Sequence, residues 1–304
     1  MPQWIDDLFA WLYLKPWPIF GRRHPFLKKV RKKINAMMYP KRGIAWIPHN
    51  QRMEIEIITA CNLKCYSCNR SSTQAPSGEM MCMEQLHKFL EESNRLNWPW
   101  RRLALIGGEP TIHPKFKEIV DLFQPYMEQN PECFLQVSTN GYGKKVKQKI
   151  ADLPEWVVLQ NSEKQGSNQS FVSYNVAPCD VDEYQNTALG PYCLEYHEDQ
   201  AVKACVLVEG CGIALTRYGY YACGPGASID RVFGFNIGIK KLEDVTHENF
   251  KKQLRSLCKY CGHYKHSDMN QEEKEILLET ETVSSSWRKA YADYKQEKPK
   301  LDLY

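Results

Sequence analysis

Three cysteines on one short loop are the residues of this chain that most clearly indicate chemistry. Cys61, Cys65 and Cys68 have the spacing C-x3-C-x2-C, with no fourth cysteine nearby. Three thiolates on one loop can bind three irons of a cubane iron–sulfur cluster and leave the fourth iron open to another ligand. A structural zinc site would close its fourth position with Cys or His, and neither follows within the next dozen residues. The spacing therefore favours a cluster with an open iron over half of a zinc site.

The segments on either side of this loop predict how it is held. Residues 53–58 alternate polar and apolar side chains, which indicates a strand that ends just before the cysteines. A helical pattern opens at residues 83–90, and the apolar run 102–106 is typical of a buried strand that leads into the segment 107–110, G-G-E-P. The order strand, loop, helix, strand favours parallel strands with helices outside them.

At this point the chain resembles the radical SAM superfamily, because the C-x3-C-x2-C loop follows the first strand and G-G-E-P follows the second. The resemblance implies that Cys61, Cys65 and Cys68 bind a [4Fe–4S] cluster and that S-adenosylmethionine (SAM) chelates the fourth iron. It also implies an α/β fold, a partial, open (β/α)6 barrel similar to a TIM barrel, with a small cluster-binding extension at its C-terminal end. In such barrels the chemistry lies at the carboxyl ends of the strands.

The G-G-E-P segment would contact SAM in such a protein. By resemblance, Gly107, Gly108 and Glu109 contact the methionyl amino group, and Pro110 completes the motif. Glycines allow the backbone to approach a ligand closely, because no Cβ stands in the way. A carboxylate or a carbonyl oxygen can accept a hydrogen bond from an ammonium group.

Four further residues are candidates for contact with SAM. The family usually has an aromatic residue just before the third cysteine, where it packs on adenine; this chain has Ser67 there and Tyr66 one place earlier. Asn140 and Ser162 follow the next two predicted strands, and their side chains offer the donors and acceptors that ribose hydroxyls or a carboxylate need. Asn-Gly and Asn-Ser pairs are also common in turns, so a local role is the alternative for both.

The alternation of strands and helices continues beyond G-G-E-P, as a barrel requires. Helices are predicted at residues 115–127 and 144–151, and strands at residues 134–138, 156–160 and 171–176. The candidate residues after these strands would then converge on one mouth of the barrel.

A second group of cysteines lies near the C-terminus. Residues 211–223 predict a β-hairpin with a cysteine at each end, and a helical stretch at 247–257 leads into a C-x2-C pair. The four thiolates are enough to close a second cluster: Cys211, Cys223, Cys258 and Cys261. The arrangement resembles the twitch, or half-SPASM, extension of radical SAM enzymes, which carries one auxiliary [4Fe–4S] cluster for electron transfer or rigidity. A structural zinc site with the same four ligands is the alternative.

The remaining cysteines are less informative. Cys205 competes with Cys211 as a cluster ligand, and it is also a candidate donor of a hydrogen atom to a product radical, because S–H bonds are weak. A free cysteine is more often a small buried apolar residue. Cys133 opens a predicted strand and is expected in the core. Cys179 and Cys193 also lie late in the predicted barrel and are further candidates for this donor, and no role follows for Cys82.

Composition limits the class of protein. The chain has 304 residues, of which 25% are charged and 43% hydrophobic, and its net charge of +4 makes no case for nucleic acid binding. The sequence has no signal peptide, so its 12 cysteines indicate metal or redox chemistry in the cytoplasm and not a disulfide framework. No apolar run is long enough to span a membrane.

Four segments are expected along the chain: an N-terminal helical and basic segment, the partial barrel, the auxiliary cluster domain and a helical tail, at residues 1–50, 51–205, 206–265 and 266–304. The first segment would pack against the barrel or, as the alternative, contact a membrane surface. In the tail, three aromatic residues fall on one face of a predicted helix that packs on the body: Trp287, Tyr291 and Tyr294.

The resemblance also implies a reaction. A reduced cluster, supplied with electrons by a donor such as flavodoxin or ferredoxin, splits SAM into methionine and a 5′-deoxyadenosyl radical, which takes a hydrogen atom from the substrate. Enzymes with this extension often modify ribosomally made peptides, so a peptide is the favoured substrate. No leader-recognition module is evident in residues 1–50, and a separate leader-peptide-binding protein is the expected partner.

Other functions stay open beside peptide maturation. A small metabolite, a sugar or a lipid is the alternative substrate, and oxidation or epimerisation the alternative outcome. A protein that is no enzyme, with two closed metal sites for electron transfer or zinc binding, is the alternative from another class. The missing fourth cysteine at the first site argues against it.

Overall fold

A six-stranded sheet forms the centre of the part of the chain that the computed structural model describes, residues 51–63, 68–72, 74–162, 212–261 and 285–304. Its strand order is β4-β3-β2-β1-β5-β6, and every neighbouring pair is parallel except β5 and β6. The strands are β1 (Arg52–Ile58), β2 (Arg102–Gly107), β3 (Phe134–Thr139), β4 (Val158–Asn161), β5 (Ile213–Thr216) and β6 (Gly219–Tyr221). The protein is of the α/β class, as predicted, and the sheet is compatible with a partial barrel.

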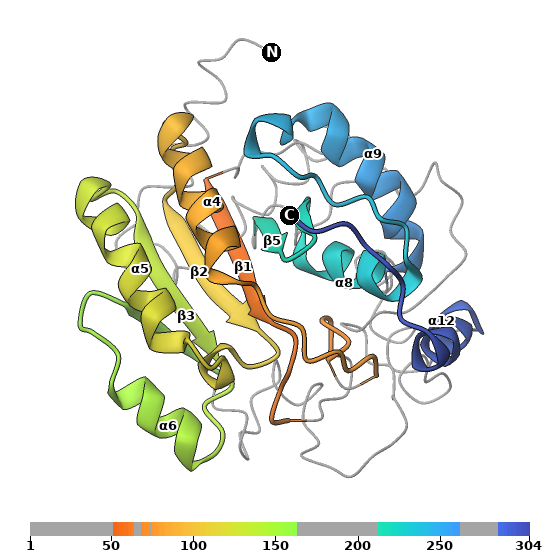
Figure 1. Cartoon of the computed structure of the whole chain (residues 1–304), viewed down its shortest axis with the longest axis horizontal. Helices are drawn as coiled ribbons and strands as arrows, with labels where there is room; N and C mark the ends of the chain where they lie inside the picture. Colours follow the sequence, from red (N-terminus) through yellow and green to blue (C-terminus); the bar gives the residue numbers. More distant parts are fainter. Residues whose placement is uncertain (1–50, 64–67, 73, 163–211, 262–284) are drawn as a thin grey trace, which may run out of the picture.

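Helices follow the first strands in alternation (Figure 1). The α-helices are α4 (Met83–Arg95), α5 (Phe116–Gln129), α6 (Lys144–Ala151), α8 (Gly224–Phe233), α9 (His247–Leu257) and α12 (Ser285–Gln296). The described residues also form single turns of 3-10 helix: η1 (Pro110–Ile112), η3 (Leu242–Asp244) and η4 (Cys258–Tyr260). The predicted helices and strands from residue 53 to residue 160 are confirmed, with small shifts at their ends. The predicted strand 171–176 lies outside the described residues.

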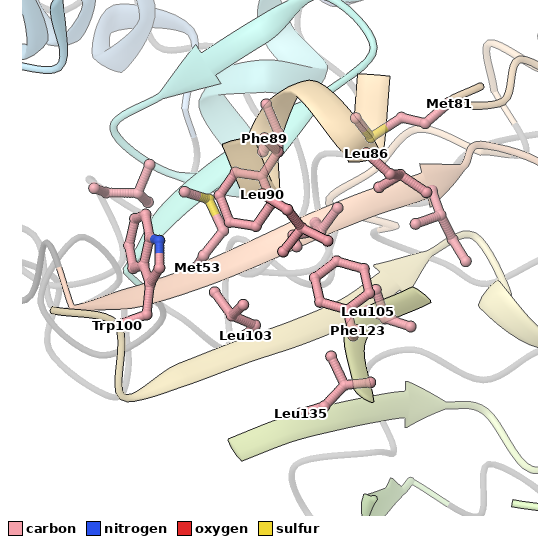
Figure 2. Packing of buried hydrophobic residues seen from close by; sticks show 14 of the residues in the cluster. Met53, Met81, Leu86, Phe89, Leu90, Trp100, Leu103, Leu105, Phe123 and Leu135 are labelled. Carbon is pink, nitrogen blue, oxygen red and sulfur yellow. The ribbon is translucent and has the colours of Figure 1, made fainter. Parts of the chain in front are cut away.

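The first strand separates two different environments. Three of its apolar side chains are completely buried in the core that helices α4 and α5 cover (Figure 2): Met53, Ile55 and Ile57. Burial of one such side chain stabilises the fold by about 2 kcal/mol. Successive side chains of a strand point to opposite faces, so Glu54 and Glu56 project from the other face of the sheet. The polar and apolar alternation that predicted this strand therefore also divides a core from a polar surface.

The predicted C-terminal hairpin forms, and it continues the central sheet. Strand β5 lies parallel to β1, with Met53 opposite Ile213 and Ile55 opposite Leu215, and β6 returns antiparallel to β5. Without this pairing the second edge of β1 would present unpaired backbone groups. The residues that follow β6, beginning at Ala222 and Cys223, are thereby brought beside the first strand.

The predicted aromatic face of the C-terminal helix is confirmed. Trp287, Tyr291 and Tyr294 of α12 are buried in a second apolar cluster, together with Ile229 and Val232 of α8. The indole N–H of Trp287 donates to the carbonyl oxygen of Tyr260 at 2.8 Å. In Figure 1 the last helices accordingly gather on the side of the sheet where β5 lies.

Among the helices that the structure describes, none has both the length and the apolar character needed to cross a bilayer. The N-terminal segment with its basic stretch, residues 1–50, lies outside the described residues, and so does the polar part of the tail, residues 262–284.

The expected core position of Cys133 leads to a first prediction. The side chain is buried in the main core, and this burial raises the pKa of the Cys133 thiol to about 12. At pH 8 only about one thiol in ten thousand is then a thiolate, the reactive form. We expect Cys133 to resist iodoacetamide in the folded protein, whereas Cys82, which is exposed at the start of α4, reacts. Mass spectrometry of peptides from briefly alkylated protein checks this, and equal labelling of the two cysteines would contradict it.

Candidate functional site

The described residues predicted to bind the first cluster or SAM follow four neighbouring strands, at one edge of the sheet. Cys61 comes three residues after the end of β1, the G-G-E-P segment follows β2, and Asn140 follows β3. Ser162 comes directly after β4. Because these four strands are parallel, their carboxyl ends lie at the same edge. The sequence predicted this convergence, and the hydrogen bonds between the loops show how it is achieved.

The glycines of G-G-E-P lie against the chain that leads into the cysteine loop. Gly108 N donates to the carbonyl oxygen of Ile58 at 2.9 Å, and Glu109 N donates to that of Ala60, also at 2.9 Å. A Cβ on Gly108 would stand 2.2 Å from the Ala60 oxygen, and a Cβ on Gly107 equally close to the Ile58 oxygen. Both positions thus require glycine for a contact within the chain, whereas the sequence explained them only by approach to SAM.

The carboxylate of Glu109 is completely buried and joins two loops. Its Oε1 accepts hydrogen bonds from Thr111 N (3.1 Å), Thr111 Oγ1 (2.7 Å) and Thr139 Oγ1 (2.8 Å), and its Oε2 accepts one from Asn140 N (2.7 Å). Pro110 follows as the buried first residue of η1. With four donors from its own chain, the Glu109 side chain holds the ends of β2 and β3 together.

Asn140 connects Glu109 to the cysteine loop. Its side-chain Nδ2 donates to Asn62 Oδ1 at 2.9 Å and points an N–H at Cys61 Sγ, 3.7 Å away. Its Oδ1 accepts from Tyr142 N at 2.8 Å, and Asn62 Nδ2 donates to the Tyr142 carbonyl at 2.7 Å. An N–H directed at sulfur favours the thiolate form, which is the form that binds iron.

Ser162 forms local hydrogen bonds to the loop after β3, the alternative that its sequence context also allowed. Its Oγ and its backbone N–H both donate to the Thr139 carbonyl, at 2.9 and 3.0 Å. Between them Gly141 adopts a φ of +67°, where a Cβ would stand 2.1 Å from Asn161 Oδ1. These contacts hold the loops after β3 and β4 side by side, and the Ser162 oxygen can still accept a hydrogen bond.

Two arginines hold the other end of the cysteine loop, and the sequence analysis did not single them out. Arg231 of α8 is buried, and its guanidinium donates to the carbonyl oxygens of Ala75 (2.7 Å), Arg70 (2.8 Å) and Ser71 (3.3 Å). Ser71 N in turn donates to the Cys68 carbonyl at 2.8 Å. No local pattern marks Arg231, since an arginine in an amphipathic helix usually faces solvent.

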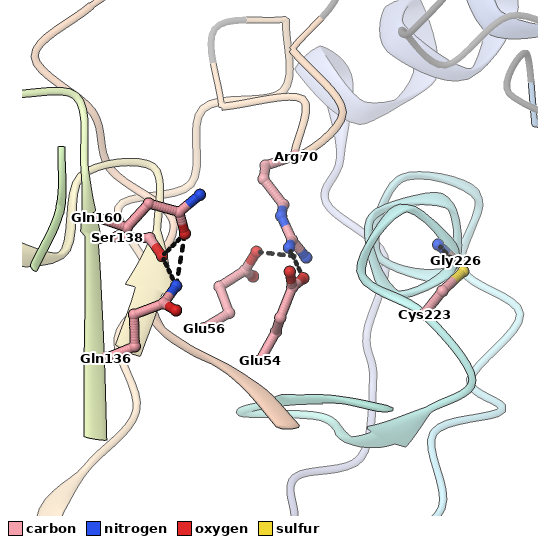
Figure 3. A network of polar contacts seen from close by, with 8 residues as sticks. All are labelled: Glu54, Glu56, Arg70, Gln136, Ser138, Gln160, Cys223 and Gly226. Atoms are coloured by element: carbon pink, nitrogen blue, oxygen red, sulfur yellow. Dashed lines mark hydrogen bonds and ion pairs between the residues drawn. The ribbon is translucent and has the colours of Figure 1, made fainter. Parts of the chain in front are cut away.

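Arg70 connects the same loop to β1 (Figure 3). Its Nη2 lies 2.5 Å from Glu54 Oε2, and its Nη1 lies 3.8 Å from Glu56 Oε2. The guanidinium also lies against Gly224, the first residue of α8, where a Cβ would stand 2.0 Å from Nη1. The one signal in the sequence was the pair of glutamates within an otherwise apolar strand.

The second cysteine group is partly described. Cys223 precedes α8 and its Sγ accepts from Gly226 N at 3.4 Å, while Cys258 and Cys261 begin and follow η4, directly after α9. A Cβ on Gly226 would touch both Cys223 Sγ and Leu257, so the start of α8 meets the end of α9. The structure thereby brings three of the four predicted ligands to the same region.

Several predicted site residues cannot be placed. Five lie outside the described residues: Cys65, Tyr66, Ser67, Cys205 and Cys211. Among the residues that are described, no three Cys, His, Asp or Glu side chains stand close enough to hold one metal ion. The donor set itself fits an iron–sulfur cluster, because Cys61 and Cys68 are partly exposed at the strand edge and an N–H group points at the Cys61 sulfur.

The four hydrogen bonds to Glu109 lead to a second prediction. In Glu109→Gln an NH2 group replaces one acceptor oxygen and faces a donor, so we expect a loss of about 2 kcal/mol in the free energy of unfolding. Thermal unfolding measures it, with Glu118→Gln as the control, since the Glu118 carboxylate is 63% exposed. A Glu109→Gln protein as stable as the control would show that the four hydrogen bonds contribute nothing.

Comparison with known proteins gives short matches to curated sequences. The chain is 30% identical over 89 residues to a probable GTP 3′,8-cyclase of Pyrococcus horikoshii, and 28% identical over 130 residues to the FeMo cofactor biosynthesis protein NifB of Azotobacter vinelandii. The matches cover 29% and 40% of this chain and 26% of each relative, so the chain spans about a quarter of the length of these relatives. No protein-family model matches the chain.

Solved structures align at lower likeness. A crystal structure of BtrN in complex with AdoMet and 2-DOIA aligns with a TM-score of 0.41 and 17% identity, over 69% of this chain and 92% of that one. The two curated relatives are radical SAM proteins. This chain, which carries C-x3-C-x2-C and G-G-E-P at the carboxyl ends of adjacent parallel strands, is similar to these radical SAM enzymes over part of its length.

Proposed function

We propose that the chain cleaves SAM reductively at a [4Fe–4S] cluster held by Cys61, Cys65 and Cys68, and that the resulting radical abstracts a hydrogen atom from a substrate. Similarity to radical SAM proteins implies SAM and one such cluster. When bound, the reduced cluster would supply the one electron that splits SAM into methionine and a 5′-deoxyadenosyl radical. The observation that carries the proposal is the network that binds the start of the cysteine loop to G-G-E-P and to Asn140 at the carboxyl edge of the sheet.

In this proposal the chain's own residues prepare the sulfur of Cys61. The N–H groups of Asn140 and Leu63 point at Cys61 Sγ from 3.7 and 3.4 Å. Such donors stabilise negative charge on a thiolate and raise the reduction potential of a cluster bound to it. The surroundings of Cys61 therefore favour a thiolate that binds iron, because both N–H groups stabilise negative charge on its sulfur.

The G-G-E-P segment would receive the methionyl end of SAM. Because the Glu109 carboxylate is occupied by four donors, the backbone carbonyls of Gly107 and Gly108 are our candidate acceptors for the methionyl ammonium. Ser162 and Asn140 stay candidates for the ribose or the carboxylate, and Tyr66 and Ser67 for the adenine.

We further propose a second [4Fe–4S] cluster on Cys211, Cys223, Cys258 and Cys261, within an auxiliary domain at residues 206–265 that follows a barrel at residues 51–205. The approach of α8 to the end of α9 supports it. A structural zinc ion bound by the same four thiolates is the alternative. The role of the cluster would be electron transfer.

The substrate we propose first is a ribosomally made peptide, presented by a separate leader-peptide-binding protein. The support is the resemblance of the second cysteine group to the twitch extension. A small polar metabolite is the second candidate. We place the reaction in the cytoplasm, with flavodoxin or ferredoxin as the electron donor.

Formation of 5′-deoxyadenosine tests the central proposal. Anaerobically reconstituted, dithionite-reduced protein should convert SAM to 5′-deoxyadenosine and methionine, measured by chromatography and mass spectrometry. The triple change of Cys61, Cys65 and Cys68 to Ala should abolish the product, while the control Cys82→Ala, at an exposed cysteine, should retain it. Product formation by the triple variant would disprove the assignment.

Stimulation by cell extract distinguishes the two substrate candidates. Extract of the source cells is added before and after digestion with a protease that is then inactivated. Stimulation that the protease destroys supports a peptide, whereas stimulation that survives excludes it in favour of a small molecule.

Iron content tests the second cluster. We expect about eight irons per reconstituted wild-type chain, and about four in the variant that lacks Cys61, Cys65 and Cys68. Cys223→Ala combined with Cys258→Ala should also leave about four irons, with Cys133→Ala as a control that keeps eight. Elemental analysis measures iron and zinc together. If the wild-type chain binds one zinc, and only the variant that lacks Cys223 and Cys258 loses it, the second site is a structural zinc site and not a cluster.

A further inference from the structure

The face of the sheet opposite helices α4 and α5 carries a row of polar side chains. Glu54 on β1 lies opposite Ala104 on β2, and Ala104 lies opposite Gln136 on β3. Strands stand about 4.8 Å apart, so Glu54 and Gln136 are separated only by the small Ala104. Glu56 and Ser138 lie two residues further toward the carboxyl ends, on the same face. This face lies just below the edge that holds the cysteine loop.

The amide end of this row is a connected network. Gln136 Nε2 donates to Ser138 Oγ at 2.8 Å and to Gln160 Oε1 at 2.5 Å, and Ser138 Oγ donates to Gln160 Oε1 at 3.0 Å (Figure 3). Each glutamine amide offers one acceptor oxygen and two N–H donors. Gln136 Oε1 and the Gln160 NH2 group take no part in these hydrogen bonds. An amide oxygen and an NH2 group can bind the hydroxyl or amide groups of a ligand.

Glu56 is the residue on this face whose bonding is incomplete. Its side chain is 8% exposed, and its one ion pair, to Arg70 Nη1, measures 3.8 Å, which is too long for a hydrogen bond. Among the residues that the structure describes, none donates a hydrogen bond to this carboxylate. Burial raises the pKa of Glu56, against the opposing effect of Arg70 and Arg231. A buried carboxylate without donors is costly, so a donor from outside the chain would be favourable.

The charges around Glu56 indicate which donor is missing. Among the described residues, the ionisable groups that act on it are the carboxylates of Glu54 and Glu79 and the guanidinium groups of Arg70 and Arg231. Within this described set, with Glu56 included, three carboxylates face two guanidinium groups. Arg70 donates to Glu54 through Nη2, and Arg231 donates to backbone carbonyls, so neither guanidinium makes a hydrogen bond to Glu56. In the described part of the chain, a positively charged group that donates hydrogen bonds would complement this carboxylate.

We propose that Glu56 binds a protonated primary amine of the substrate, while Gln136 and Gln160 bind neighbouring hydroxyl or amide groups. This inference rests on the proposed function, because it places the substrate on the face below the cysteine loop. A lysine side chain or free N-terminus of a peptide and the amino group of a small polar metabolite share this chemistry. A substrate without an amine, such as a fatty acyl chain, would not satisfy the site.

Acetylation of primary amines tests whether the substrate must carry an amine, and it shows whether that amine belongs to a peptide or to a small metabolite. Extract of the source cells is separated into a peptide fraction and a fraction of low molecular mass, and half of each is acetylated with acetic anhydride, which removes the charge of primary amines. We expect the stimulation of 5′-deoxyadenosine formation to fall at least tenfold on acetylation. The fraction in which this occurs shows whether the amine belongs to a peptide or to a metabolite. Full stimulation by both acetylated fractions would overturn the proposal.

A variant of Glu56 tests the residue itself. Glu56→Gln keeps the shape of the side chain and removes its charge, and loss of a charge-assisted hydrogen bond should lower the stimulated rate by about 10- to 100-fold. Glu91→Gln, at an exposed carboxylate of α4, is the matched control and should match the wild type. Because Glu56 accepts no hydrogen bond, we also expect the Tm of Glu56→Gln, without substrate, to equal or exceed that of the control.

Two outcomes separate failure of this inference from failure of the proposed function. A Tm of Glu56→Gln several degrees below that of the control would show that Glu56 is a structural partner of Arg70, and would overturn the substrate role. A wild-type chain that forms no 5′-deoxyadenosine with any fraction contradicts the proposed function instead. The comparison of the two Tm values still tests Glu56 in that case.

Discussion

The buried carboxylate of Glu109 is the interaction on which the candidate site depends. A carboxylate removed from water is unfavourable unless donors surround it, and Glu109 collects four of them from the loops after β2 and β3. One of these donors is the backbone N–H of Asn140, whose side chain then reaches Cys61 and Asn62. The position of the first cysteine is therefore set by the chain itself, through a short series of hydrogen bonds that begins at one buried charge.

The other end of the cysteine loop depends on the C-terminal helices. Arg231 of α8 holds the carbonyl oxygens that follow Cys68, and Tyr291 of α12 shares a hydrogen bond with Ser71 at 3.0 Å. Arg70 joins β1 to the first residue of α8, beside Cys223. The segments that carry the two cysteine groups are consequently parts of one connected framework. A change at either group should be felt at the other, because they share these arginines.

The polar face of β1 is maintained at some expense of stability. Met53, Ile55 and Ile57 gain burial on one side of the strand, whereas Glu54 and Glu56 place two carboxylates in a nearly dry environment on the other. Apolar residues there would pack without the cost of removing charge from water. Functional sites commonly retain such unfavourable groups, and this one lies below the cysteine loop, where a substrate of the proposed reaction would have to be held.

Local patterns in the sequence predicted the kind of most elements and indicated the chemistry of the first site. The period of apolar residues predicted β1, α6 and α9, because it reports which side of a segment is buried, and the cysteine spacing with G-G-E-P indicated the superfamily. Only the tertiary structure decided that β5 pairs with β1, that four donors surround Glu109 and that Arg231 reaches a loop 160 residues earlier. These partners lie far apart in the chain, and they are selected by the need to satisfy every buried polar group at once, which no local pattern records.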